Sequence, residues 1–316
     1  MGAKISTREA YGRALCEIGS DTRIIVLEAD LSICTMSGYF GEAFPDRYFN
    51  VGIAEANMID MAAGFATTGC NAFCHSFAMF TAGRGYEQIR NSVAYPHLNV
   101  KVIGSHAGLT VGRDGATHQC IEDLSLMRTI PGMVVLSPCD ATETRYAVKA
   151  LATYEGPVFM RTSRIAFEDV ISSFPTYQFE IGKGVELVNG NDLTLCATGL
   201  MVQVALKAQK VLSEKGLNAR VIDMHTIKPL DQEIICKAAK ETGAILTVEE
   251  HNIIGGLGSA VAETVGEWCP IPIARVGVND TFGRSGEADE LLELYGLNVQ
   301  NIVLKAMDLY TRKKGL

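Results

Sequence analysis

The fold is decided by the stretch VKVIGSHAGLTVGRDGATHQ at residues 100–119. Its first six residues are mostly apolar and predict a buried strand, which ends where His106 begins a glycine-rich turn. Gly112 and Gly115 can take positive φ angles, so this turn can approach a ligand closely. Ligand sites in open parallel sheets lie at the carboxyl ends of the strands. The stretch therefore predicts a strand that leads directly into a binding site.

Strand-like and helical segments alternate on both sides of this stretch, which predicts an α/β fold with a parallel sheet covered on both faces. The strands are expected at 23–29, 47–51, 71–75, 100–105, 133–137 and 157–160. Ionisable groups follow all six of them: Asp30, Glu55, His75, His106, Asp140, and Arg161 with Arg164. Turns are polar in any protein, but six such ends in succession favour a functional site.

The alternation fades after residue 164 and then resumes. We expect a first domain at 1–168, a linker at 169–186 that holds Ser172, Ser173 and Pro175, and a smaller α/β domain at 187–316.

Residues 61–83 carry no Asp, Glu, Lys or Arg. By its length alone, this stretch could span a membrane. Because polar residues and Gly69 interrupt it, a buried helix, a turn and a buried strand are the better interpretation.

Composition limits the possible partners and the compartment. The 316 residues are 47 % apolar and 20 % charged, which predicts a sizeable core, and the net charge of −8 argues against nucleic acid or an anionic membrane as a partner. The nine cysteines are scattered, odd in number and without C-x-x-C spacing, as expected of reduced thiols in a cytoplasmic protein. Met1–Arg8 shows no apolar segment of a secretory signal.

Two motifs resemble a known family. Residues 50–55 fit N-x-G-x-x-E, and residues 106–119 fit H-x5-G-x-D-G-x-T-H-Q. Together they resemble the pyrimidine-binding domain of transketolases, while TIKPLD at 226–231 and TVEEH at 247–251 resemble the C-terminal domain of that family. The resemblance covers nearly the whole chain in order. It implies a parallel-sheet domain that binds thiamine diphosphate, followed by a smaller α/β domain.

The resemblance assigns the cofactor contacts. Glu55 matches the acid that hydrogen-bonds the aminopyrimidine ring and promotes removal of the thiazolium C2 proton. Burial among Ile53, Met58 and Met61 would resist ionisation of this carboxyl, although a glutamate at a helix start also complements the helix dipole. Phe77 and Phe80 match the aromatic pair that packs against the ring; as core aromatics they would look the same. A third aromatic is often found where this chain has Gly83, and Tyr86 is its expected substitute.

The same resemblance assigns the substrate contacts. His106 matches a residue at the sugar-phosphate end, His118 matches a catalytic residue near the reacting carbon, and Asp114 matches a contact to substrate hydroxyls. A lone histidine at a strand end is more often structural, but two of them bracket the glycine-rich turn. The resemblance also assigns an acid that orders the cofactor site near the subunit interface, Asp30, and two phosphate-binding arginines, Arg8 and Arg164.

Arg113 departs from the family pattern, because many transketolases have an acidic residue between this glycine and aspartate. A solvated surface arginine is one interpretation. The other is an unusual anionic substrate, such as a sulfonate or a phosphate on an uncommon sugar. The two interpretations differ in what they predict for a variant without the positive charge of Arg113. Only the second predicts that the variant changes its preference among donor ketoses.

The sequence has no Gly-Asp-Gly, the motif with which the family anchors Mg²⁺ and the diphosphate. A separate N-terminal transketolase subunit is expected to supply both, which implies an α2β2 enzyme that acts on sugar phosphates and is inactive without its partner. Three alternatives remain open: a β subunit of a 2-oxoacid dehydrogenase, a fragment of a deoxyxylulose-phosphate synthase, and a non-catalytic regulatory paralogue. Retention of Glu55, His106, Asp114 and His118 argues against the last.

Overall fold

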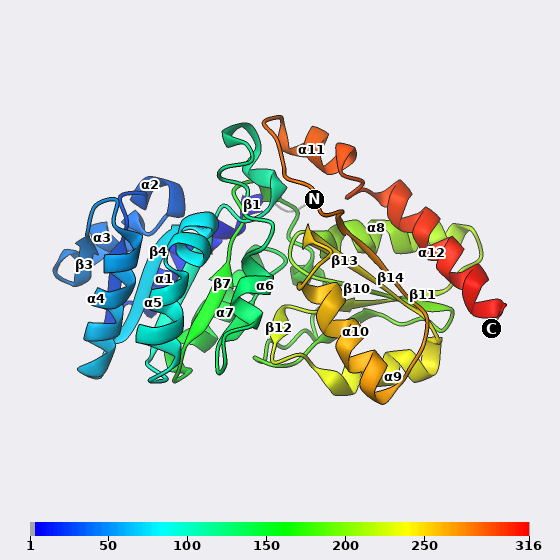
Figure 1. Cartoon of the computed structure of the whole chain (residues 1–316), viewed down its shortest axis with the longest axis horizontal. Helices are drawn as coiled ribbons and strands as arrows, with labels where there is room; N and C mark the ends of the chain where they lie inside the picture. Colours follow the sequence, from blue (N-terminus) through cyan, green and yellow to red (C-terminus); the bar gives the residue numbers. More distant parts are fainter. Residues whose placement is uncertain (1–3, 316) are drawn as a thin grey trace.

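A computed structural model describes residues 4–315. The chain forms two α/β units that lie side by side along its long axis (Figure 1). The first unit is built on a sheet with the strand order β12-β6-β7-β5-β4-β2-β3, which is parallel except for the edge pair β12–β6. Its strands are β2 Ile24–Glu28, β3 Tyr48–Asn50, β4 Asn71–Phe77, β5 Val100–Ser105, β6 Val134–Leu136, β7 Val158–Arg161 and β12 Thr226–Lys228.

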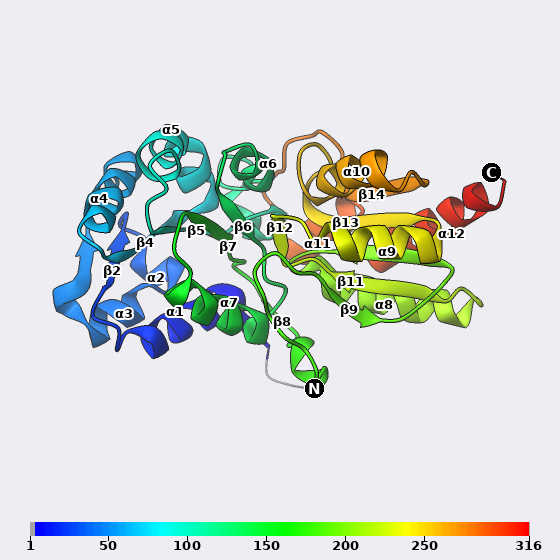
Figure 2. The ribbon, with the colours of Figure 1, turned by 90° about the horizontal axis from the view of Figure 1, so that it is seen from below.

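Helices cover both faces of this sheet. They are needed because the central strands carry buried residues on both faces. Figure 2 shows α4, α5 and α6 on one side and α1 and α7 on the other. The helices are α1 Thr7–Ile18, α2 Ser32–Thr35, α3 Gly38–Ala43, α4 Glu55–Thr67, α5 Tyr86–Gln88, α6 Asp123–Arg128 and α7 Ala141–Thr153. Two π-helical segments, Met79–Arg84 and Ile89–Ala94, flank α5, and 3-10 helices lie at Pro45–Arg47, Leu109–Asp114 and Ile171–Ser173.

The second unit has the strand order β14-β13-β10-β11-β9, in which only β9 runs antiparallel to its neighbour. Its strands are β9 Val185–Val188, β10 Leu193–Ala197, β11 Ala219–Asp223, β13 Ile245–Asn252 and β14 Ile273–Val278. Its helices are α8 Met201–Glu214, α9 Gln232–Thr242, α10 Leu257–Trp268, α11 Ala288–Leu294 and α12 Val299–Lys314. A separate two-stranded sheet pairs β1 Ile5–Ser6 with β8 Ala166–Phe167.

The two units are not independent. After β11 the chain returns to the first sheet, where β12 pairs with β6, and it then re-enters the second unit at α9. One apolar cluster also runs through both units, joining Met58 and Leu124 of the first to Ile235 and Leu257 of the second. We did not expect this exchange from the sequence, because a three-residue strand carries almost no periodic signal.

One expected strand boundary is corrected, and the interpretation of the charge-free stretch holds. The strand expected at 71–75 continues to Phe77, so His75 and Ser76 lie inside β4 and not at its end. His75 is fully buried, with Nε2 2.5 Å from the Tyr11 hydroxyl and Nδ1 2.9 Å from the Leu27 carbonyl oxygen, and burial lowers its pKa to about 4. The charge-free stretch 61–83 divides among α4, β4 and a π-helical segment, and no helix among residues 4–315 has the length and apolarity of a bilayer span.

Candidate active site

Glu55 is the first residue of α4, which follows the carboxyl end of β3 through a turn at Gly52 with φ 75°. Its carboxylate is 2 % exposed, and Arg84 Nη1 lies 2.8 Å from each of its two oxygens. Burial of Glu55 therefore agrees with expectation, but two details differ. Ile53 is 77 % exposed and takes no part in it, and the carboxylate has a cationic partner, Arg84, that no sequence motif indicates.

The aromatic pair lies beside this carboxylate. The Phe77 and Phe80 rings are stacked with centroids 5.8 Å apart, and the Arg84 guanidinium lies 4.6 Å from the Phe80 centroid. Tyr86 does not supply the third aromatic: it packs against the main apolar cluster, and its hydroxyl lies 3.2 Å from Thr129 Oγ1. The guanidinium of Arg84 is the third planar group at this position.

The two histidines adjoin the same aromatic pair. The His106 ring stacks on Phe77 at 4.0 Å, and the His118 ring meets Phe80 edge-on at 5.3 Å. The structure thus brings Glu55, the aromatic pair and both histidines into one continuous group, although they come from four separate segments.

Positive charge surrounds His106 at the end of β5. Its Nδ1 lies 2.9 Å from Ser105 Oγ, and its Nε2 lies 3.5 Å from Arg8 Nη1. Burial lowers the pKa of His106 to about 3, with further contributions from Arg8, Arg164 and His118. Near neutral pH, His106 is therefore an uncharged hydrogen-bonding group next to two arginines.

The two arginines near His106, Arg8 and Arg164, come from different parts of the first unit. Arg8, in the first turn of α1, donates to the Cys34 carbonyl at 2.8 Å, and burial lowers its pKa. Arg164 follows β7, donates to the Val111 carbonyl and lies 3.7 Å from an Asp114 oxygen. The structure therefore brings Arg8, Arg164, Asp114 and His106 together in one group, which we call the basic mouth.

Asp30 lies apart from that mouth, on the side of Glu55. It has φ 63° in the turn after β2, and its Oδ1 accepts a hydrogen bond of 3.1 Å from Asn50 Nδ2. The Asn50 side-chain oxygen in turn accepts from the backbone N–H groups of Asp30 at 3.2 Å and Gly52 at 3.0 Å. Asp30 thereby ties the β2 end to the turn that presents Glu55.

Arg113 points toward the second unit. Its Nε lies 2.5 Å from Glu287 Oε1, and both side chains are largely exposed. A hollow of about 300 Å³ lies between the 3-10 helix at Leu109–Asp114 and the start of α11, and Arg113, Arg164 and Glu287 contribute to its wall. Arg113 is thus an exposed residue in an ion pair, next to a basic side chain of the mouth.

Contacts between the units hold the glycine-rich turn in place. Glu250 Oε1 accepts from the Thr110 N–H at 2.7 Å, and burial raises the Glu250 pKa to about 7. Gln119 Nε2 donates to the carbonyls of Leu109, Gly112 and Arg284 at 3.0–3.2 Å. Sequence analysis found both motifs but gave neither residue this role, which depends on contacts between units.

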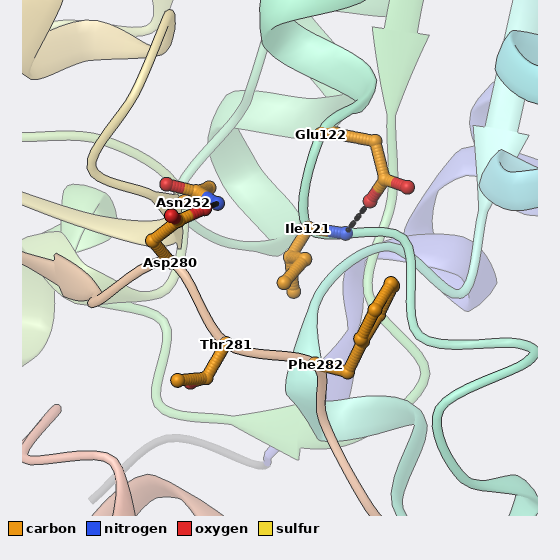
Figure 3. A pocket seen from close by; sticks show the side chains of 6 residues that line it. All are labelled: Ile121, Glu122, Asn252, Asp280, Thr281 and Phe282. Carbon is orange, nitrogen blue, oxygen red and sulfur yellow. Dashed lines mark hydrogen bonds between the residues drawn. The ribbon is translucent and has the colours of Figure 1, made fainter.

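Two further features hold none of the predicted site residues. A hollow of about 260 Å³ lies between the units, lined by Ile121, Glu122, Asn252, Asp280, Thr281 and Phe282 (Figure 3). Among residues 4–315, one cluster has three side chains close enough to share a metal ion: Cys139, Glu143 and Asp223. Tyr177 donates to Glu143 there, and burial raises the Asp223 pKa well above its usual value.

Comparison with known proteins agrees with this geometry. The family model of the transketolase pyrimidine-binding domain matches residues 3–169, and that of the transketolase C-terminal domain matches residues 182–302. The chain is 49 % identical to a transketolase C-terminal section of Methanocaldococcus jannaschii, with 95 % of both chains covered. It is 43 % identical to the 6-deoxy-6-sulfo-D-fructose transketolase subunit SqwH of a Clostridium species, with 97 % of this chain and 95 % of that one covered.

A solved structure titled as a split-gene transketolase, an inactive beta4 tetramer, matches with a TM-score of 0.90 and 48 % identity over 98 % of this chain and all of that one. The fold and the matched family models define a two-domain chain, in which a transketolase pyrimidine-binding domain is followed by a transketolase C-terminal domain. The chain belongs to the transketolase family, in which it corresponds to the C-terminal section of a split enzyme. The expected fold class is confirmed, and the similar chains favour transketolase over the three alternatives.

Proposed function

We propose that this chain is the C-terminal subunit of a two-chain, thiamine diphosphate-dependent transketolase. It transfers a two-carbon ketol unit from a ketose phosphate, or a related anionic ketose, to an aldose acceptor. One observation carries the proposal: the buried carboxylate of Glu55 and the Phe80 ring, which stacks on Phe77, both contact a single guanidinium. In this scheme residues 1–168 bind the pyrimidine, 169–186 are the linker and 187–316 are the C-terminal domain.

These residues fit an aminopyrimidine ring. Glu55 offers an acceptor or a shared proton, and Phe80 offers an aromatic face for stacking. Both now contact a planar group with N–H donors, Arg84, and this contact supports the fit of a flat donor at the two positions. When bound, thiamine diphosphate supplies the carbon nucleophile that splits the ketose. Glu55 would hold or give up a proton at the pyrimidine nitrogen.

We assign Mg²⁺ and the diphosphate mainly to the partner subunit. Mg²⁺ prefers carboxylate, carbonyl and phosphate oxygens in octahedral geometry. In the part of the chain that the structure describes, the cluster at Cys139, Glu143 and Asp223 includes a thiol and is fully buried. A thiol is a poor ligand for this hard cation, so the cluster does not fit the role.

The basic mouth suits an anionic sugar. Arginine forks bind phosphate or sulfonate oxygens, so Arg8 and Arg164 would hold the anionic end. His106, kept neutral by burial and by the arginines, can share a hydrogen bond without repelling them. Asp114 can accept from sugar hydroxyls, and His118, whose ring meets Phe80 edge-on, would move a proton at the reacting carbon.

A partner surface is supported by exposed apolar side chains on the side of Glu55. Ile53 lies two residues before it, and Ile33 lies three residues after Asp30; both are largely exposed. Exposed apolar groups next to a functional site favour an interface. We propose an N-terminal transketolase subunit as the partner, an α2β2 assembly, and a cytoplasmic location in which the nine cysteines remain free.

Reconstitution tests the proposal. The purified chain is mixed with an N-terminal section from the same source, thiamine diphosphate and Mg²⁺, and ketol transfer is followed with ketose phosphates and sulfonates as donors. We expect transfer only when both chains are present. Full activity of this chain alone, or none with any such partner, would refute the proposal.

Arg113 is tested in the same assay. The Arg113→Ala variant, with Lys207→Ala as a control at another exposed ion pair, is compared with wild type over the donor panel. If Arg113 helps to select the anionic group, the ratio of kcat/KM between sulfonate and phosphate donors shifts at least about threefold. An unchanged ratio makes Arg113 a surface residue only.

A further inference from the structure

Arg84 makes an ion pair that the established family motifs do not include. Its Nη1 bridges both oxygens of Glu55 at 2.8 Å, and its guanidinium carbon lies over the Phe80 ring at 4.6 Å. One flat cation thus occupies both surfaces that would receive the pyrimidine ring. Glu55 is almost fully buried, whereas the Arg84 side chain is 53 % exposed.

The ion pair has a clear physical cause. A buried carboxylate without a partner is strongly unfavourable, because it has lost its hydration without compensation. Arg84 supplies the opposite charge and two hydrogen bonds, and stacking of a guanidinium on an aromatic ring adds a further attraction. The pair therefore compensates the burial of the Glu55 carboxylate.

The local helix geometry brings Arg84 to this place. It ends the π-helical segment Met79–Arg84, which contains Phe80 and directly follows β4 and Ala78. A π-helical segment shifts the register of the residues after it, and such segments are frequent at functional sites. The shift sets the guanidinium above Phe80 and within reach of the α4 start.

We propose that Arg84 is an internal occupant of the pyrimidine position: it satisfies Glu55 and Phe80 in the cofactor-free subunit and is displaced when the ring docks. The inference rests on the proposed role of Glu55. The Glu55 oxygens and the Phe80 face that Arg84 contacts are the ones we assign to the pyrimidine ring, so docking of the ring on these surfaces breaks the ion pair.

Two opposite effects follow from the loss of Arg84. Without the competing group, the reconstituted enzyme binds thiamine diphosphate more tightly, because the free energy of breaking the ion pair is no longer subtracted from binding. The isolated chain becomes less stable, because Glu55 is left buried and unpaired. A residue that only supports the bound ring would give weaker binding, so the sign of the first effect separates the two roles.

The test uses Arg84→Met, which keeps an unbranched apolar stem. Equilibrium dialysis of the reconstituted enzyme measures the Kd for thiamine diphosphate, and thermal unfolding of the isolated chain measures Tm. We expect Kd to fall about five- to tenfold and Tm to fall by roughly 2–5 °C. In a Glu55→Gln background the Tm difference should vanish, since no buried charge remains.

Two further variants test whether the effects are specific to the guanidinium of Arg84. Arg90→Met, at an exposed arginine of the same helical stretch that bonds Asn91, is the matched control and should change neither Kd nor Tm. Arg84→Lys keeps the charge without the flat fork, and its Kd should lie between those of wild type and Arg84→Met. If wild type binds the cofactor and Arg84→Met binds it equally or less tightly, the Arg84 proposal is overturned. If wild type itself binds none, the proposed function fails first.

Discussion

Neutral His106 makes a measurable contribution to the pH dependence of stability. The folded chain keeps this imidazole uncharged down to its pKa of about 3, because it is buried and lies beside Arg8 and Arg164. The unfolded chain takes up a proton near the ordinary value of 6.5. A lowered histidine pKa means that the stability is fully present above 6.5 and is lost as the pH falls from 6.5 toward 3.

The magnitude follows from linkage. Between 6.5 and pH 5 the unfolded imidazole binds its proton over about 1.5 pH units, and each unit corresponds to about 1.4 kcal/mol. Wild type should therefore lose roughly 2 kcal/mol more than His106→Asn when the pH is lowered from 7 to 5. Asparagine is the suitable replacement because residue 106 has φ 57°, a left-handed conformation that asparagine tolerates.

The assay is urea unfolding of the isolated chain at 25 °C, with the free energy of unfolding measured at pH 7, 6 and 5. Groups other than residue 106 contribute equally to both proteins, so their pH dependence cancels in the difference. His97 also has φ 57° but is exposed, which makes His97→Asn the matched control for replacing an imidazole by an amide. If the wild-type and His106→Asn curves stay parallel from pH 7 to 5, His106 binds its proton in the folded chain and the reasoning is wrong.

Two predictions concern the junction between the units. In Gly108→Ala, φ of 82° is unfavourable for alanine and the new Cβ would collide with the Glu250 carboxyl, so urea unfolding should show a loss of about 2–4 kcal/mol. Gly64→Ala is its control, because a Cβ at this helical position has open space, and it should be neutral or stabilising. If the two variants lose the same free energy of unfolding, the predicted collision with Glu250 is wrong. Arg161 pairs with fully buried Asp123, with Nε 3.1 Å from Oδ2. Arg161→Met should therefore cost about 3–5 kcal/mol in the same assay, and a loss below about 1 kcal/mol would show that Asp123 needs no cation.

Much of the site could be predicted because strand ends have a strong local signal. The buried strand β5 ends at Ser105, and the next residue, His106, places its polar side chain at the carboxyl end of the sheet. Glu55 begins α4 directly after β3 and a glycine turn. In both cases a hydrophobic run ends at a polar residue, and this pattern does not depend on distant contacts.

The rest of the site depends on helix register and on partners. The π-helical segment Met79–Arg84 turns Arg84 toward Glu55, and the spacing of a regular helix with 3.6 residues per turn does not predict this contact. Ile53 was expected in the core because it is apolar, yet hydrophobicity does not distinguish a core residue from one that another chain covers. Glu250 and Gln119 act across the units, and no local pattern encodes such contacts.

The central claim is that Glu55 acts on the bound cofactor in a two-chain enzyme. Glu55→Gln keeps the size and hydrogen-bonding capacity of the side chain but cannot hold or give up the proton. It should assemble with the N-terminal section and lower kcat for ketol transfer by about 10²–10⁴-fold. Asp60→Asn, at an exposed carboxylate of the same helix, is the control and should remain fully active.

That rate measurement tests the account most directly. A Glu55→Gln complex with a loss of at least about a hundredfold, beside an unaffected Asp60→Asn complex, is the predicted result. A Glu55→Gln complex that transfers the ketol unit within about twofold of the wild-type rate would contradict the assignment of Glu55 and leave a supporting, non-catalytic role for this chain.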